Sequence, residues 1–358
     1  MPDLKEQIIN ALRVVQDPDL HQDIVTLGFV RNVTVDAAGK ANATICLTTP
    51  ACPVKEQLKA QCEAVIRAVP GVTDVNVIMT AEVRSAKPDA NKSLIEGVRN
   101  IIAVGSGKGG VGKSTTAVNL AIALGKMGAR TGVLDADIYG PNVPGMLGVT
   151  GRPKVIDNRI IPLQAHGIVC MSMGFMVDGD TPLVWRGPML HGVMKQLLQD
   201  VRWGSLDYLI IDLPPGTGDV QLSLSQTVPV TGAVIVTTPQ NVALQDARKA
   251  VAMFQKVSVP LLGIIENMSY FLCPKCGHRE EIFDTAGGEN AASKLNVPFL
   301  GRVPLNTSIR ESMDVGNPVA ASDGEFAKIY SEIAQRVAQQ ISLLNSDSKR
   351  PISVVRER

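Results

Sequence analysis

A glycine-rich run with two lysines is the part of the sequence best suited to chemistry. It reads Gly107-Lys108-Gly109-Gly110-Val111-Gly112-Lys113-Ser114-Thr115 and matches the phosphate-loop pattern G-x-x-x-x-G-K-[ST]. Glycines let backbone N–H groups converge on phosphate oxygens, and a helix N-terminus adds partial positive charge. The preceding run IIAVGS predicts a strand and the following run predicts a helix, which is the context the motif requires. We expect an ATP site in which Lys113 neutralises the β- and γ-phosphates and the Ser114 hydroxyl coordinates Mg²⁺.

Three carboxylates end apolar runs that look like buried strands. Asp135 and Asp137 end the run TGVLDAD, and Asp212 ends DYLIID. Because the carboxyl ends of parallel strands meet at one edge of a sheet, we expect these side chains to lie near the phosphate loop. Carboxylates placed there can reach the metal and the attacking water of a nucleotide hydrolase. Asp212 is the predicted carboxylate ligand of Mg²⁺, and the Pro- and Gly-rich segment 135–144 is a predicted switch.

Cys273 and Cys276 stand in the run CPKCG, at a spacing that lets two thiolates on a turn face one metal. Four thiolates normally complete a tetrahedral zinc site or a cubane iron–sulfur cluster. One chain supplies a single pair, so a complete site requires a second chain or further ligands. Three interpretations stay open: a shared [4Fe–4S] cluster, a structural zinc site with His278 nearby, and a redox pair. The redox pair is disfavoured because no helix begins after the cysteines.

Apolar runs that resemble strands buried on both faces recur from residue 101 to residue 304, and helix-like segments separate most of them. This alternation is typical of a doubly wound, mainly parallel sheet. The predicted fold class is α/β, with a P-loop NTPase domain at 97–343 preceded by a small α/β domain at 1–80. A polar linker is expected at 81–96 and a disordered tail at 344–358.

The composition argues against several classes of protein. The chain has 358 residues, with 35 Lys and Arg against 34 Asp and Glu, which gives a net charge of +1. A protein with so little net charge has no overall positive electrostatic field that would attract a polyanion such as nucleic acid. Aromatic residues make up 4%, which argues against a base-stacking surface for nucleic acid. No apolar run approaches the roughly 20 residues of a membrane span, and the charged first segment has no signal-peptide core. We expect a soluble, cytoplasmic protein that binds neither nucleic acid nor a membrane.

The phosphate loop carries a second lysine, Lys108. The run KGGVGKS resembles the deviant phosphate loop of the ATPase family that contains the nitrogenase iron protein and the septum-site and chromosome-partition ATPases. The resemblance implies a nucleotide-sandwich homodimer in which Lys108 reaches the partner's nucleotide. It also implies that Asp137 positions the attacking water, that Asp135 supports Mg²⁺ indirectly, and that Asn267 contacts adenine.

The order of the motifs KGGVGKST, DADIYGPNVP, VWRGPM, DYLIIDLPPGTGD and ENMSYFLCPKCG closely resembles the Mrp/ApbC family of iron–sulfur cluster carrier ATPases over residues 97–343. The resemblance implies that Cys273 and Cys276 bridge a [4Fe–4S] cluster between the protomers of a homodimer. It further implies an ATP-hydrolysing carrier that works with a cluster assembly scaffold and transfers its cluster to apo iron–sulfur proteins.

Two other functions stay open. A partition- or positioning-type ATPase with a structural zinc bridge would need a basic amphipathic helix at its C-terminus, whereas the tail contains Pro351 and no apolar stripe. An ATP-driven electron donor like the nitrogenase iron protein would keep its cluster bound and would have single, widely spaced ligand cysteines. The paired cysteines therefore favour a transferable cluster.

The N-terminal region has a candidate thiol of its own. Through DPDLHQDIVTLGFV and TTPACP, most of residues 3–80 resembles a small domain of iron–sulfur assembly factors, whose characteristic cysteine corresponds to Cys52. Cys52 precedes Pro53, which is expected in the first turn of a helix. A helix N-terminus lowers a thiol pKa, so Cys52 is predicted to be a possible accessory thiolate. A half-buried structural cysteine is the alternative.

Overall fold

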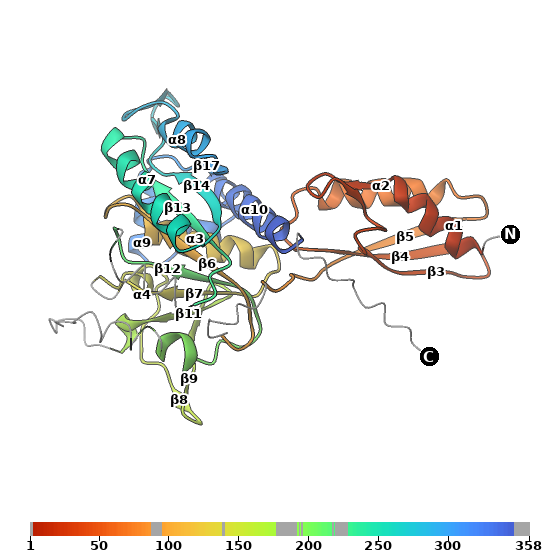
Figure 1. Ribbon diagram of the computed structural model, residues 1–358, viewed down its shortest axis with the longest axis horizontal. Coiled ribbons are helices and arrows are strands. Elements are labelled where there is room, and N and C mark those ends of the chain that lie inside the picture. The colour runs from red at the N-terminus through yellow and green to blue at the C-terminus, as the bar shows by residue number, and fades with distance from the viewer. Residues whose placement is uncertain are drawn as a thin grey trace. The chain divides into compact units, whose positions relative to one another are not determined.

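The computed structural model describes residues 3–86, 95–137, 140–176, 192, 194, 196–216, 218 and 228–346 (Figure 1). They form two compact units. The smaller unit comprises the residues up to Arg84 together with those from Ala338 on, and the larger comprises Ser85–Val337. The motif VWRGPM and parts of the predicted linker, switch and tail lie outside the described residues.

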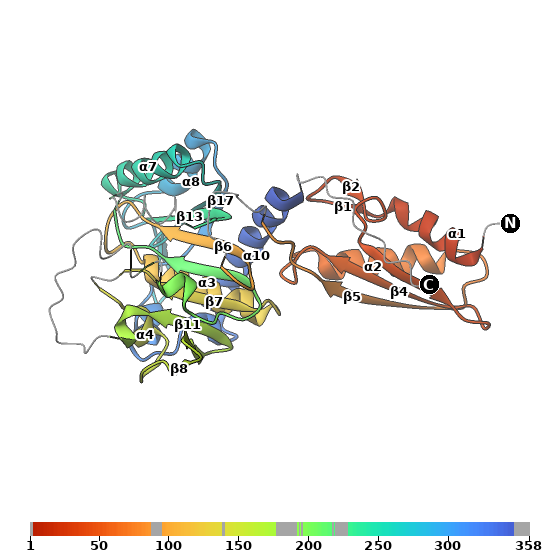
Figure 2. The same cartoon turned by 60° about the horizontal axis from the view of Figure 1, so that its bottom comes forward.

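The larger unit is built around one long sheet, whose described strands follow the order β10-β11-β7-β12-β6-β13-β14-β17. Every neighbouring pair is parallel except β10 and β11, which are antiparallel. In Figure 2 the strands follow one another from β13 through β6 and β7 to β11. They are β6 (Val98–Gly105), β7 (Thr131–Asp135), β10 (Leu163–Ala165), β11 (Ile168–Ser172), β12 (Leu206–Asp212), β13 (Gly232–Thr237), β14 (Leu261–Glu266) and β17 (Phe299–Arg302).

The central strands are covered on both faces. All 7 residues of β12 and all 6 of β13 are buried, which requires a packed layer on each side of the sheet. The helices of this unit with described bounds are α3 (Lys113–Lys126), α4 (Val143–Met146), α7 (Asn241–Lys256), α8 (Gly287–Leu295), α9 (Thr307–Asp314) and, up to Val337, α10 (Glu325–Ser346), with the 3-10 turns η2 (Met173–Phe175) and η3 (Val319–Ala321). The predicted α/β class with a doubly wound, mainly parallel sheet is confirmed.

The carboxyl ends of the parallel strands open onto one edge of the sheet. Asp212 at the end of β12 lies opposite Asp135 of β7 and Val104 of β6. Thr237 at the end of β13 lies opposite Glu266 of β14. The loops after these strands therefore share one edge, which is where ligands bind to such sheets.

The smaller unit is an α/β layer pair. Its sheet joins β3 (Val30–Val35) antiparallel to β4 (Lys40–Leu47) and β4 parallel to β5 (Asp74–Ala81). Burial alternates along β4, so one face of this sheet is buried. The other elements of this unit are α1 (Leu4–Ala11), η1 (Leu12–Val14), α2 (Lys55–Arg67) and the short pair β1 (Gln16–Asp17) and β2 (Gln22–Asp23). The core cluster includes Ile8, Leu12, Phe29, Ile45 and Ile66.

Two local expectations differ from the structure. Pro53 does not lie in the first turn of a helix, because α2 begins at Lys55 with Val54 as its cap. The antiparallel edge strand β10 is absent from the predicted strands, since LQA carries no apolar run. In the larger unit, β8 (Val155–Ile156) pairs with β9 (Arg159–Ile160), and β15 (Phe271–Leu272) pairs with β16 (Arg279–Glu280). None of the described helices combines the length and apolar character that crossing a membrane requires.

Candidate functional site

The phosphate loop joins the end of β6 to the start of α3. Gly110 and Gly112 have φ of +78° and +84°, a left-handed backbone that favours glycine. A side chain at Gly112 would also collide with Asn267, because a Cβ there would lie 2.0 Å from Asn267 Nδ2. The Ser106 hydroxyl donates to the carbonyl oxygen of Lys108 at 3.0 Å within the same loop. The sequence thus folds locally into a strand, a glycine-rich turn and a helix, as the motif requires.

Gly107 is needed for a second close approach. A Cβ at Gly107 would lie 2.2 Å from the backbone carbonyl carbon of Asp246 in α7. Backbone atoms cannot yield as a flexible side chain can, so the loop passes α7 at this distance only with glycine. The phosphate loop is therefore packed directly against α7.

Lys113 begins α3 and is held in a buried ion pair. Its Nζ donates to Asp212 Oδ1 at 2.7 Å and lies 3.9 Å from Asp137 Oδ2. The side chains of Lys113 and Asp212 are 7% and 1% exposed. Burial raises the pKa of Asp212, and the Lys113 ammonium opposes that shift. The structure thus brings together three predicted site residues that are far apart in the sequence.

The oxygen atoms beside this ion pair fit Mg²⁺. Asp212 Oδ2 is buried and has no hydrogen-bond partner among the described residues. Ser114 Oγ lies 3.3 Å from Lys113 Nζ. A carboxylate oxygen and a hydroxyl next to a phosphate-binding loop are the ligands that Mg²⁺ takes in nucleotide sites. Ser114 and Asp212 are therefore the residues that could hold the metal.

Asp135 supports the loop that carries Asp137. Its Oδ1 accepts the backbone N–H of Asp137 at 3.1 Å, and its Oδ2 accepts the Ser172 hydroxyl at 3.0 Å and the backbone N–H of Val143 at 3.2 Å. Burial, and then the neighbouring Asp212 charge, raise the pKa of Asp135 to about 7. The carboxyl group of Asp135 thus holds the backbone at Asp137 and at Val143, near the two ends of the predicted switch, while Asp137 faces Lys113.

Asn267 lies against the phosphate loop. Its Nδ2 donates to the carbonyl oxygen of Val111 at 2.9 Å, and its backbone N–H donates to Thr237 O at 2.8 Å. Contact of Asn267 with adenine stays a prediction. Lys108 is partly exposed, and within the described ranges no carboxylate forms an ion pair with it. Its predicted reach to a partner's nucleotide also stays a prediction.

The two predicted cluster ligands lie on the turn between β15 and β16. The backbone N–H of Cys273 donates to His278 O at 2.9 Å, and that of Gly277 donates to Cys273 O at 2.8 Å, so the hairpin closes tightly around the pair. Backbone N–H groups of Lys275 and Cys276, and the Cys276 thiol, lower the pKa of Cys273. Cys273 is partly exposed and Cys276 is exposed. A turn of this kind presents two sulfur atoms outward with donors that favour the thiolate.

A single chain does not complete a metal site with these cysteines. Across the described ranges, no three or more His, Cys, Asp or Glu side chains are grouped so that they could hold a metal ion. Two thiolates fall short of the four that a zinc or cubane site uses. A zinc or cubane site at these cysteines would therefore need ligands beyond those that the described residues group together.

Two buried polar side chains, Ser172 and Glu266, are absent from the predicted site residues. The Ser172 hydroxyl donates to Asp135, and Glu266 is fully buried at the end of β14. Both lie at the last position of a strand on the functional edge of the sheet. A polar residue that ends an otherwise apolar strand is the signal that could have identified them.

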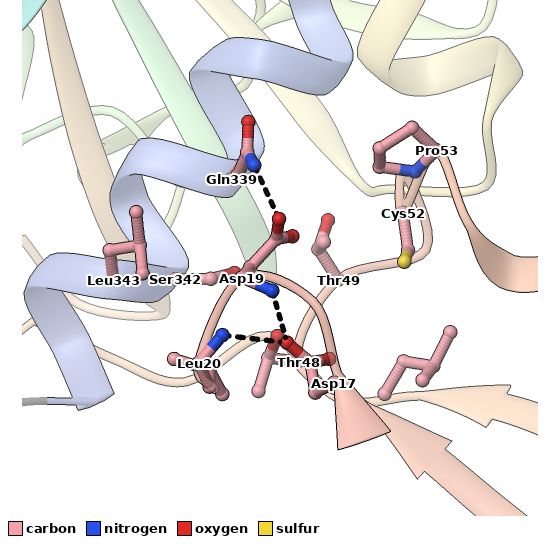
Figure 3. Close-up of a pocket in the computed structure, with 11 residues that line it drawn as sticks. Asp17, Asp19, Leu20, Thr48, Thr49, Cys52, Pro53, Gln339, Ser342 and Leu343 are labelled. Atoms are coloured by element: carbon pink, nitrogen blue, oxygen red, sulfur yellow. Dashed lines mark hydrogen bonds between the residues drawn. The ribbon is translucent and has the colours of Figure 1, made fainter. Parts of the chain in front are cut away.

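Cys52 lies in the smaller unit and lines a pocket there with Asp17, Asp19, Thr49 and residues of α10 (Figure 3). Gln339 donates to Asp19 Oδ1 at 2.5 Å across this pocket. Burial raises the pKa of Cys52 to about 11, the negative charges of Asp17 and Asp19 add to the rise, and the backbone N–H of Val54 opposes it. The expectation of a lowered pKa is wrong, because the thiol is half-buried among carboxylates.

We expect alkylation of Cys52 to be slow near neutral pH and to accelerate as the pH rises toward 11. With a pKa near 11 instead of 9.0, the thiol carries roughly 100-fold less thiolate at neutral pH. Iodoacetamide labelling of a Cys273→Ser/Cys276→Ser chain, read by peptide mass spectrometry, gives the rate at each pH. The exposed Cys276 of the wild-type chain is the reference. A Cys52 rate that levels off below pH 9 would contradict the expectation.

Two family descriptions match the chain. One, a NUBPL iron-transfer P-loop NTPase, matches residues 97–338. The other, an iron–sulfur cluster assembly protein, matches residues 5–77. The first contains the phosphate loop and the cysteine pair, and the second contains Cys52.

Individual proteins agree with these matches. The iron–sulfur cluster carrier protein of Synechocystis sp. is 49% identical over 346 residues, which cover 94% of this chain and 98% of that protein. The iron–sulfur cluster transfer protein NUBPL of Dictyostelium discoideum is 48% identical over 269 residues, or 74% of this chain and 83% of that protein. A solved nucleotide-binding protein from Archaeoglobus fulgidus, in complex with ADP, is 38% identical with a TM-score of 0.56 and covers 62% of this chain and 88% of its own.

Proposed function

The chain belongs to the iron–sulfur cluster carrier family of P-loop NTPases, and we propose that it is an ATP-hydrolysing homodimer that carries a [4Fe–4S] cluster and transfers it to apoproteins. The observation that supports this most is the hairpin with Cys273 and Cys276. It offers two outward thiols in the same compact unit as a complete phosphate loop.

The cargo is held by thiols from two chains. One hairpin supplies two of the four thiolates that a cubane cluster needs, so two hairpins supply all four. The exposure of Cys276 suits a cluster that is handed on, because an acceptor's thiols must reach the iron during exchange. A buried set of four thiolates from one chain would favour a cluster that stays bound to the protein.

Nucleotide handling follows from the buried ion pair. The phosphates of ATP replace Asp212 as the partner of the Lys113 ammonium, which lies at the start of α3 where backbone N–H groups also face them. Mg²⁺ held by Ser114 and Asp212 would supply positive charge to the β- and γ-phosphates. Asp137 lies near enough to Lys113 to orient a water toward the γ-phosphate. Lys108 contributes its charge to the nucleotide of the partner subunit.

Transfer itself tests the proposal. The cluster-loaded protein is mixed anaerobically with an apo-enzyme that needs a [4Fe–4S] cluster, in the presence of an iron chelator that captures free iron. We expect the enzyme's activity to appear while the carrier loses its cluster absorbance. Cys46→Ser, which changes a cysteine of the smaller unit, is the matched control and should transfer normally.

Two outcomes would overturn the proposal. A cluster that stays on the protein and changes redox state with ATP would indicate an electron donor. A protein that holds zinc and no sulfide would indicate a positioning-type ATPase with a structural metal bridge.

A further inference from the structure

A short segment connects the phosphate loop to the cysteine pair. It begins at Asn267, whose side chain donates to the carbonyl oxygen of Val111 in the loop at 2.9 Å. It continues without a break to Cys273, the first thiol of the hairpin. Any shift of the loop that disturbs the Val111 contact therefore acts on a chain segment that leads directly to the thiols.

The side chain of Glu266 anchors this segment. Glu266 is fully buried, and its Oε1 accepts the hydroxyl of Ser269 at 2.5 Å. Its Oε2 accepts the backbone N–H of Gly288 at the start of α8, and Arg302 Nε of β17 lies 3.9 Å from Oε1. One carboxylate thus joins the turn after β14 to α8 and β17. A buried charge with several partners resists local rearrangement, because losing any of them leaves it poorly compensated.

The backbone of the segment is also hydrogen-bonded to residues 303–305, which follow β17. The N–H of Val303 donates to Glu266 O at 2.9 Å, that of Ser269 to Val303 O at 3.0 Å, and that of Leu305 to Tyr270 O at 2.7 Å. Between these contacts Met268 adopts a left-handed backbone with φ of +53°. The turn is therefore tight and hydrogen-bonded at both ends. A displacement of Asn267 is expected to move the whole segment and not to deform the turn locally.

We propose that Glu266 is a positioning residue that, through Ser269, couples nucleotide occupancy of the phosphate loop to the geometry of the Cys273 and Cys276 thiols. The inference rests on the proposed function only in assigning the cargo to these thiols. Nucleotide binding changes the contacts of Asn267. Because Glu266 holds the turn in one conformation, the displacement of Asn267 moves the β15–β16 hairpin that carries the two thiols. The coupling is reciprocal, so occupancy of the thiols also changes nucleotide affinity.

Thiol reactivity in iron-free protein tests the coupling. The rate of DTNB modification of Cys273 and Cys276 is measured with and without a saturating, non-hydrolysable ATP analogue and Mg²⁺. A Cys273→Ser/Cys276→Ser chain gives the background from the other cysteines. We expect the analogue to change the wild-type rate by about fivefold or more, in the range of ordinary coupling energies.

The variants separate coupling from folding. Ser269→Ala and Glu266→Gln should reduce the analogue's effect to less than about 1.5-fold, whereas Ser269→Thr, which keeps the hydroxyl, should restore it. Ser312→Ala removes a comparable hydroxyl hydrogen bond, to Ile309 O in α9, and should behave as wild type. Because the analogue is saturating, a variant that only binds the analogue more weakly still shows the full change in DTNB rate.

The inference fails if the wild-type thiols do not respond to the analogue, or if Ser269→Ala and Glu266→Gln respond fully. Neither result bears on cluster binding, since no iron is present. A chain that transfers clusters without this response overturns the inference alone. A chain whose thiols respond but which binds no cluster overturns the proposed function alone.

Discussion

Replacing Lys113 with alanine is expected to slow ATP hydrolysis by on the order of 10²- to 10³-fold. In the proposed nucleotide site the Lys113 ammonium is the cation that faces the phosphates, and at 7% exposure it is poorly screened by water. Its removal also leaves the Asp212 carboxylate buried without its partner, which costs about 3 kcal/mol of stability. Phosphate release at saturating ATP measures the loss, and circular dichroism establishes that the variant is folded.

Lys126→Ala is the matched control, because Lys126 belongs to the same helix. Its side chain is 38% exposed and pairs with Asp323, which is 99% exposed. Exposed pairs contribute about 0–1 kcal/mol, so hydrolysis should stay within about twofold of wild type. The Lys113→Ala protein should still bind a cluster, since the cysteine hairpin does not use Lys113. A folded Lys113→Ala chain that hydrolyses ATP normally, or that loses its cluster as well, would contradict the separate roles of the two sites.

Replacing both Cys273 and Cys276 with serine is expected to remove the cluster completely. Serine hydroxyls do not replace thiolates as cluster ligands, and among the described residues no group of three or more His, Cys, Asp or Glu side chains could hold the cluster instead. The pair is exposed or partly exposed, so the substitutions should change the free energy of unfolding by less than about 0.5 kcal/mol. Iron and labile sulfide per chain, together with the visible absorbance of the cluster, measure the effect.

The same variant should keep its ATP hydrolysis within about threefold of wild type, allowing for the proposed coupling between thiols and nucleotide. Cys52→Ser is its control, since Cys52 has a raised pKa and belongs to the smaller unit. That protein should bind iron and sulfide as wild type does. Loss of the cluster in Cys52→Ser, or its persistence in the Cys273→Ser/Cys276→Ser chain, would place the ligands elsewhere.

The central strands could be predicted because a strand buried on both faces requires a continuous run of apolar residues. Runs such as DYLIID and GAVIVT correspond to β12 and β13, in which every residue is buried. The phosphate loop could be predicted because its residues are contiguous and each has a local role. The edge strand β10 could not, since it is short and its residues are only partly buried or exposed.

The contacts inside the site depend on tertiary structure. The ion pair of Lys113 with Asp212 joins residues 99 positions apart and requires the register between β6 and β12. The raised pKa of Cys52 follows from burial and from Asp17 and Asp19, which the local sequence pattern does not reveal. The role of Glu266 likewise depends on Gly288 and Arg302, which approach it only in the folded sheet.

The most direct test of the central claim is the composition of the wild-type protein in solution. Iron, labile sulfide and zinc per chain are measured after anaerobic purification, together with the mass of the particle by light scattering. One cubane shared between two hairpins predicts a dimer with about two iron and two sulfide per chain. Stoichiometric zinc without sulfide, or a monomer that holds a complete cluster, would contradict a cluster carried between two protomers.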